Sequence, residues 1–167
     1  MKPETLISVS ATVIALASLW VSLAQTRSIQ THNRQSVRPL LKIRRVKNFE
    51  ASRTGIQVVN AGLGPAIVTT TIVRLDGETV GEWDRKTYRR LMDGPPVWPK
   101  VSTLTEGVPV LTGQVLHLLF LDDFDSDEHA WFWTLVSERL SIEIFYESLY
   151  GGENFRAVLK PREDAQA

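Results

Sequence analysis

The sequence contains no cysteine, which excludes disulfide bonds, thiolate metal sites and a cysteine nucleophile. It has no excess of charge either, because 19 basic residues balance 19 acidic ones, and the global electrostatic footprint of a nucleic-acid-binding protein is therefore missing. The Gly-x-Ser-x-Gly, Walker A and His-Glu-x-x-His patterns do not occur. These absences leave catalysis without positive support, and we expect no cofactor and no nucleic-acid partner.

The most informative segment is uncharged and lies near the N-terminus, at residues 6–24 (LISVSATVIALASLWVSLA). As a helix it spans about 28 Å at about 1.5 Å per residue, close to the ~30 Å hydrocarbon core of a bilayer. We therefore expect a transmembrane helix at residues 1–25. A cleaved signal peptide is the alternative, with Lys2 as its basic region and Ser22-Leu23-Ala24 as its cleavage site. The apolar run exceeds the roughly 7–15 residues of a signal peptide, which favours the anchor.

The flanking charges predict the orientation of this helix. Between this segment and Glu50, the first acid on its C-terminal side, every charged residue is basic: Arg27, Arg34, Arg38, Lys42, Arg44, Arg45 and Lys47. By the positive-inside rule, that side is cytoplasmic. We expect a single-pass inner-membrane protein with a cytoplasmic domain, and a periplasmic or secreted domain if the segment is cleaved.

Small residues recur along the same segment with a 3-4-3-4 spacing that places them on one helical face: Ser8, Ala11, Ala15, Ser18 and Ser22. Small faces let transmembrane helices approach closely, so self-association in the lipid is expected. The alternative is that serine and alanine are simply common in bacterial hydrophobic segments. Residues 26–38 are polar and predict a helical or flexible stalk, which ends at Pro39.

From Pro39 onward, short apolar runs alternate with turn residues. We expect strands at 40–46, 55–60, 66–75, 78–80, 109–111, 115–121, 140–146 and 154–159, with turns at Asp76-Gly77 and Gly151-Gly152. About seven strands within residues 39–162 predict a mainly β, immunoglobulin-like antiparallel sandwich, and a small Greek-key barrel is the alternative. Residues 163–167 are expected to form a disordered tail.

Two helical insertions interrupt the strand pattern, at residues 82–92 and 126–139. The second has Ser126 as its expected N-cap and acids in its first turn. In an immunoglobulin-like sandwich, this helix would cross from the fifth strand to the sixth, between the two sheets.

The most distinctive motif is Asn60-Ala61-Gly62-Leu63-Gly64-Pro65-Ala66. A dinucleotide-binding loop opens a helix, whereas a β-branched strand follows here, so we interpret the motif as a tight connection between strands. Gly62 and Gly64 are expected to take positive φ, Asn60 to cap the turn, and Pro65 to fix the start of the next strand.

This turn, together with the membrane segment and the sequence His32-Asn33-Arg34-Gln35-Ser36-Val37-Arg38-Pro39, resembles a group of small, uncharacterised bacterial membrane-anchored proteins. The Asn-x-Gly turn is also similar to that of adhesion-type, immunoglobulin-like bacterial modules. The resemblance covers about the first 75 residues. It implies an anchor and a fold, and no catalytic residue can be carried over from it.

An acidic cluster at Asp122, Asp123, Asp125, Asp127 and Glu128 imitates the start of a calcium loop. The sixth position is Glu128 instead of Gly and the twelfth is Thr134 instead of Glu, so the EF-hand pattern fails. A looser divalent-metal site is the alternative to a solvated loop that caps a helix. The three histidines show no ligand spacing.

Two aromatic segments are candidate contact surfaces. The loop at residues 95–99 is stiff, because its prolines favour polyproline II geometry, and Trp98 lies at its centre between Pro96 and Pro99. Trp131, Phe132 and Trp133 are consecutive and cannot all face one side of a helix. Trp98 and the pair Trp131 and Trp133 are candidate contacts with a protein partner, whereas packing of the 95–99 loop on its own domain is the favoured interpretation of that loop.

Three functional hypotheses result. The leading one is a membrane-anchored interaction or sensing module without catalytic activity. The second is a membrane-perturbing effector whose transmembrane helix oligomerises when the β domain senses a ligand. The third is a divalent-metal-dependent enzyme that uses the acidic cluster at residues 122–128.

Overall fold

The computed structural model describes residues 3–48, 53–92, 94 and 97–162, although the side chains of residues 4–6, 8–10, 30–35 and 48 lie outside that description. The chain divides into two compact units, Met1–Ser36 and Val37–Ala167. The first is a helix and the second is mainly β.

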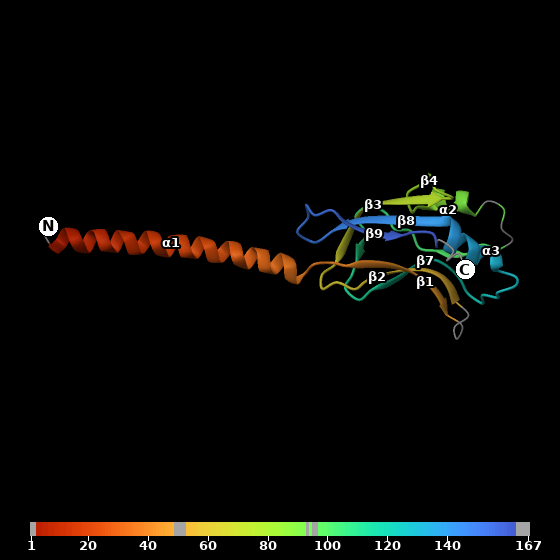
Figure 1. The fold of residues 1–167 in the computed structure, drawn as a ribbon, viewed down its shortest axis with the longest axis horizontal. Coiled ribbons are helices and arrows are strands. Elements are labelled where there is room, and N and C mark those ends of the chain that lie inside the picture. The colour runs from red at the N-terminus through yellow and green to blue at the C-terminus, as the bar shows by residue number, and fades with distance from the viewer. Residues whose placement is uncertain (1–2, 49–52, 93, 95–96, 163–167) are drawn as a thin grey trace. The chain divides into compact units, whose positions relative to one another are not determined.

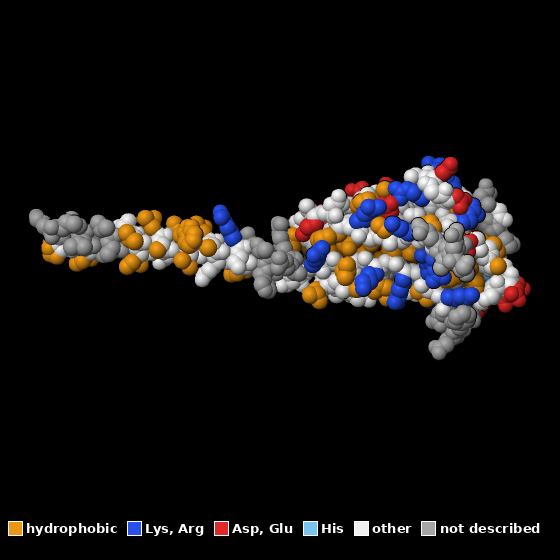
Figure 2. Space-filling view, in the orientation of Figure 1, with side chains coloured by type: hydrophobic (Ala, Val, Ile, Leu, Met, Phe, Trp, Pro, Cys, Tyr) orange, Lys and Arg blue, Asp and Glu red, His pale blue; other side chains and the backbone are white. Residues whose placement is uncertain are grey.

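The first unit is the helix α1 (Pro3–Ser36), which ends before Pro39 as its sequence predicts. Figure 2 shows hydrophobic side chains on the surface of its described part, and the Trp20 side chain is 73% exposed. Among the residues that the structure describes, no helix is both long enough and apolar enough to cross a membrane. The predicted span also includes Leu6 and residues 8–10, whose side chains are not among those described.

The second unit contains two antiparallel sheets, which form the two layers visible in Figure 1. One sheet has the order β1-β2-β7-β5, from strands β1 (Leu41–Asn48), β2 (Arg53–Asn60), β7 (Val115–Leu121) and β5 (Lys100–Val101). The other has the order β4-β3-β8-β9, from β4 (Glu78–Gly81), β3 (Ala66–Leu75), β8 (Leu140–Glu147) and β9 (Phe155–Leu159), and β6 (Pro109–Val110) also pairs with β3.

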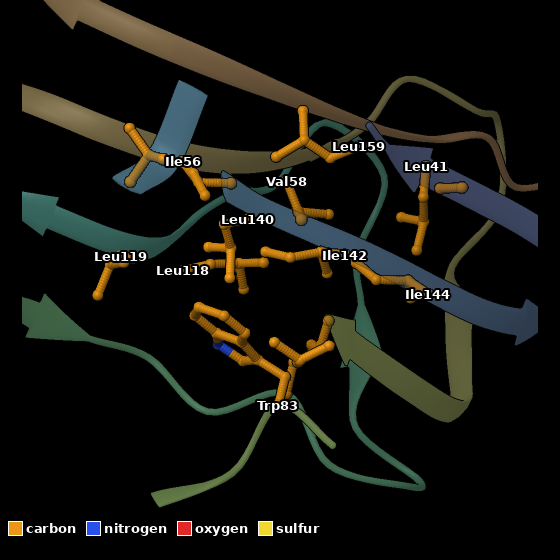
Figure 3. Close-up of a cluster of buried hydrophobic side chains, with 14 of the residues drawn as sticks. Leu41, Ile56, Val58, Trp83, Leu118, Leu119, Leu140, Ile142, Ile144 and Leu159 are labelled. Atoms are coloured by element: carbon orange, nitrogen blue, oxygen red, sulfur yellow. The ribbon is translucent and has the colours of Figure 1, made fainter. Parts of the chain in front are cut away.

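The core lies between these two layers because the strands alternate buried and less buried positions. Ile56 and Val58 of β2 and Ile142 and Ile144 of β8 are fully buried, and Figure 3 shows them in one cluster with Trp83. Side chains separated by two residues share a sheet face, so this alternation directs one face of each sheet toward the other.

The two sheets are joined in different ways at their two pairs of edge strands, β1 with β9 and β4 with β5. On one side, the Arg45 guanidinium of β1 donates to the carbonyls of Val136 and Lys160, both at 2.6 Å. On the other side, the helix α2 (Arg85–Leu91) follows β4 and precedes β5. Buried Trp83 precedes this helix, and its indole Nε1 donates to the carbonyl of Ser102 at 2.8 Å. The α2 segment therefore connects the edge strands of both sheets.

The strand count and both helical insertions differ from the sequence prediction. Nine strands are present in the described part instead of about seven; β6 lies within the strand expected at 109–111, whereas the two-residue strand β5 was not predicted. The helix expected at residues 82–92 is shorter, since Asp84 caps α2 by accepting from the Thr87 amide at 2.7 Å. The backbone of Asp84 itself is extended, so the helix begins only at Arg85.

Ser126 is not the N-cap of the second insertion. Instead the Asp125 carboxylate accepts the amides of Asp127 and Glu128, at 2.7 and 3.0 Å, which forms a turn before the helix. The α-helix α3 (Ala130–Thr134) then continues as the π-helix η1 (Leu135–Arg139). This insertion connects β7 to β8 and so passes from one sheet to the other, as predicted.

Candidate binding groove

A groove of about 300 Å³ lies where α2 meets the segment before β5. Six residues line it, and we call it the Trp98 groove: Arg85, Tyr88, Arg89, Trp98, Val101 and Thr103. Its volume is at the lower limit of the ~300–1,000 Å³ typical of ligand pockets. Its walls combine aromatic rings with cations, which suits a ligand that has both apolar and anionic parts.

Tyr88 holds residues 97–99, which we call the Trp98 loop, in place. The Tyr88 hydroxyl donates to the carbonyl of Pro99, and the rings of Tyr88 and Trp98 meet edge to face with their centroids 5.7 Å apart. Burial raises the pKa of the Tyr88 phenol, so the group stays protonated and keeps its donor. Pro99 is buried, whereas the Trp98 side chain remains 57% exposed. The loop is thus fixed at Pro99 and presents Trp98 to solvent.

The charge of the groove comes from α2. Arg85 and Arg89 are four residues apart, which places them on one face of the helix, and both are exposed. Within the described residues neither arginine makes an ion pair. Lys86 and Arg90 are exposed on the same helix, and Arg90 donates to the carbonyl of Val80 at 3.2 Å. The groove therefore has two guanidinium groups without a carboxylate partner in the described part of the chain.

The other aromatic candidates serve the domain itself. Phe132 is fully buried, and Trp131 and Trp133 are half-buried and pack against the core. Lys47 and Arg162 lie over the Trp133 ring, 5.5 and 5.7 Å from its centroid. The indole Nε1 of Trp131 is buried and has no hydrogen-bond partner among the described atoms. Pro96 lies outside the described residues.

The Asn60 turn connects three separate segments of the chain. The Asn60 amide is fully buried and makes four hydrogen bonds. Its Nδ2 donates to the carbonyls of Gly64 and Val110, at 2.8 and 2.9 Å, and its Oδ1 accepts the amides of Leu40 and Gly62, at 3.2 and 3.0 Å. The motif therefore joins β2 to β3 and also fixes the start of the domain.

The reason for the glycines in this turn differs from the prediction. Neither Gly62 nor Gly64 is among the residues with positive φ. A Cβ on Gly62 would lie 2.3 Å from the Leu40 nitrogen, and one on Gly64 would lie 1.9 Å from the Val37 oxygen. The glycines thus permit the close approach of residues 37–40. The proline after them, Pro65, directly precedes β3.

The acidic cluster does not converge. Asp122 is bound by Arg53 and Lys100, both at 2.7 Å, and these hydrogen bonds lower the pKa of its carboxyl group. Asp125 accepts backbone amides of the turn before α3, and these bonds lower its pKa as well. Among the described side chains, no group of three His, Cys, Asp or Glu could hold a metal ion. The metal hypothesis therefore gains no support from this geometry.

A polar relay crosses the outer face of the β1-β2-β7-β5 sheet. The Arg44 guanidinium donates to Gln57 Oε1 at 3.3 and 3.2 Å, and Gln57 Nε2 lies 2.7 Å from His117 Nε2. Because Arg44 occupies the oxygen of the Gln57 amide, its nitrogen donates and His117 Nε2 must accept. Burial and the nearby Arg53 lower the His117 pKa, and Asp122 opposes them only in part.

The predicted small face of α1 is exposed where it is described, at Ala11, Ala15, Ser18 and Ser22, and the Ser8 side chain lies outside the description.

Arg85, Tyr88 and Arg89 are not among the site residues predicted from the sequence. The segment Arg85-Lys86-Thr87-Tyr88-Arg89-Arg90 contains a pattern that could have identified them. Tyr88 and Arg89 follow Arg85 by three and four residues, so all three share one face of a helix. Nothing in the sequence indicates that Trp98 would pack on that tyrosine. No protein-family model matches the chain, and a search of curated proteins finds none that is similar to it.

Proposed function

We propose that this chain is a single-pass, membrane-anchored binding module without catalytic activity, whose β domain presents the Trp98 groove to a partner. One observation carries the proposal: Trp98 is exposed beside two arginines that lack a carboxylate partner in the described residues. Exposed Trp and Arg side chains are the residue types that most often dominate binding energy at protein interfaces. The other aromatic candidates are half-buried in packing.

The anchor in this proposal rests on the uncharged sequence at residues 6–24 and on the side chains that α1 exposes. Ile14, Leu16 and Trp20 are each more than half exposed, and an apolar surround would remove this area from water. The basic residues after the segment favour a cytoplasmic domain, and the small face supports association of two α1 helices.

We also propose that the domain is immunoglobulin-like, in keeping with the resemblance of its Asn60 turn. The sheet order β1-β2-β7-β5 corresponds to the A-B-E-D sheet of that fold, and β3-β8-β9 corresponds to C-F-G. The edge strand β4 then takes the place of C′ beside C. In such domains binding is commonly performed by loops and edges that the sandwich positions, as it would be by the Trp98 groove.

Fractionation of cells that express the full chain tests the anchor. The protein is expected in membranes, resistant to alkaline extraction, with a C-terminal reporter active only in the cytoplasm. Recovery of the protein in the soluble fraction, or a mature chain that starts at Gln25, would contradict it.

Site-specific photo-crosslinking in those cells tests the groove. A photoreactive residue in place of Trp98 is expected to form a discrete adduct, whereas the same residue in place of Leu111 is expected to form none. Leu111 is a matched control, since both side chains are 57% exposed. Equal cross-linking at the two positions would contradict the proposed contact surface.

A further inference from the structure

We propose that the Trp98 groove recognises an acidic peptide segment of a partner protein, one in which a large apolar side chain is flanked by carboxylates. The inference rests on the proposed function, because it names the partner class of the same groove. It follows from the charge and the shape of the groove.

The charge selects an anion. Arg85 and Arg89 line the groove, and both lack an ion pair within the described residues. A guanidinium group presents parallel N–H donors that match a carboxylate in two-point geometry. Two such groups on one helical face match two carboxylates of a peptide, one on each side of a central residue.

The aromatic part of the groove selects the central residue. Tyr88 and Trp98 meet edge to face at 5.7 Å, and Val101 adds an aliphatic wall. The Tyr88 hydroxyl is committed to the Pro99 carbonyl, so its ring, not its hydroxyl, is offered to a ligand. This part of the groove therefore suits an apolar side chain and offers few polar groups that could hydrogen-bond to a polar side chain.

The extent of the surface favours a peptide over a small molecule. Beyond the groove, Lys86 and Arg90 continue the exposed basic face of α2, and Val97, 41% exposed, continues the apolar side at the Trp98 loop. A ligand that uses all of these groups must extend past a pocket of about 300 Å³. A short acidic segment in extended conformation has this reach, at about 3.3 Å per residue.

The groove lies at the other end of the domain from the point at which the chain enters it. The chain enters the domain at residues 38–40, which bond to the Asn60 turn. Trp98 precedes Lys100, which pairs with Phe120, and Phe120 pairs with Gly55 at the other end of β2. The groove and the start of the domain are therefore separated by most of a strand length, roughly 15–20 Å.

Fluorescence anisotropy with labelled peptides tests the proposal on the full chain in nanodiscs of phosphatidylcholine, which carry no net charge. The probe is the peptide Glu-Glu-Phe-Glu-Glu, and its controls are Glu-Glu-Ala-Glu-Glu and Lys-Lys-Phe-Lys-Lys. We expect the probe to bind and both controls to bind at least about tenfold more weakly, because each lacks one of the two recognised features. Raising the salt concentration should weaken the binding, since exposed charges are screened.

Matched variants assign the binding to the groove. Trp98→Ala and the double variant Arg85→Gln with Arg89→Gln should each weaken it by about tenfold or more, while Leu111→Ala and the double variant Lys42→Gln with Arg44→Gln should not. All the replaced side chains are exposed, and circular dichroism confirms that each variant is folded.

Two results would overturn the proposal: binding that is indifferent to Trp98→Ala, or tight binding of anionic phosphatidylglycerol vesicles with no binding of the acidic peptide. Either could occur while the protein still fractionates with membranes and still cross-links through residue 98. Failure of the peptide assay would then reject the acidic-peptide class and leave the anchored binding module standing.

Discussion

Replacement of Asn60 by alanine is expected to destabilise the domain more than any surface change. The amide makes two fully buried hydrogen bonds, to Gly64 and Val110, and two half-buried ones, from Leu40 and Gly62. At about 1.5 kcal/mol for each buried bond and about 0.5 kcal/mol for each half-buried bond, the loss is about 4 kcal/mol. Total stabilities of roughly 5–15 kcal/mol make this a large fraction of the free energy of unfolding.

Urea denaturation of residues 37–167, followed by tryptophan fluorescence, measures this loss. With an m-value of about 2 kcal/mol/M, the midpoint should fall by about 2 M at unchanged slope. Asn154→Ala is the matched control, because Asn154 is exposed and should shift stability by less than about 0.5 kcal/mol. A loss below about 1 kcal/mol for Asn60→Ala would refute the assignment of the Asn60 amide as the junction of three segments.

Three further changes probe other parts of the domain. Gly64→Ala should destabilise the domain by about 2 kcal/mol or more in the same denaturation assay, because the new Cβ would lie 1.9 Å from the Val37 backbone oxygen. Gly77→Ala is the control: it is strained only by the positive φ of residue 77 and should cost about 1 kcal/mol. The folded state lowers the pKa of His117, so the free energy of unfolding should fall as the pH drops from about 6.5 toward the lower folded pKa. His117→Gln should abolish that part of the pH dependence. An unchanged pH profile in this variant would contradict the hydrogen-bonded relay from Gln57 to His117. The hydrogen bond from Arg74 lowers the pKa of Glu143; burial opposes this shift and Arg156 adds to it. The contribution of ionised Glu143 to stability should therefore be complete above about pH 4.5 and should decline as the pH falls through the lower folded pKa. Glu143→Gln should remove this decline in an acid titration followed by circular dichroism.

The long strands and their turns could be predicted because their signals are local. β3 occupies residues 66–75 as expected, since a run of β-branched residues fits a pleated, half-buried surface. Asp76 and Gly77 have φ values of 52° and 87°, the positive pair that a two-residue hairpin requires. The crossing between sheets was predicted from the strand order of an immunoglobulin-like sandwich, although seven strands, not five, precede it in the described part of the chain.

The remaining features depend on contacts that the sequence pattern does not reveal. β5 is two residues long, too short for any alternation to be recognised. Gly62 and Gly64 are required by the backbone of residues 37–40, which approaches them from an earlier part of the chain. In the groove, the Tyr88 hydroxyl bonds to Pro99, eleven residues away, and the Tyr88 ring packs against Trp98, a contact that the helical pattern of residues 82–92 does not reveal.

The register of β1 has a mechanical consequence for a domain held by its N-terminal side. β1 pairs with β2 over eight residue pairs, from Leu41 with Asn60 to Asn48 with Arg53. Hydrogen bonds of an antiparallel ladder run perpendicular to the strands, so a pull on Val37 directed along β1 loads these bonds in shear, all together, instead of opening them one after another. The backbone bonds from Ala61 to Leu40 and from Leu63 to Arg38 lie in the path of the same force. The first strand is thus built as a mechanical clamp: its ladder would carry a load applied to the N-terminal side of the domain, and the domain would unfold only when the whole ladder had yielded.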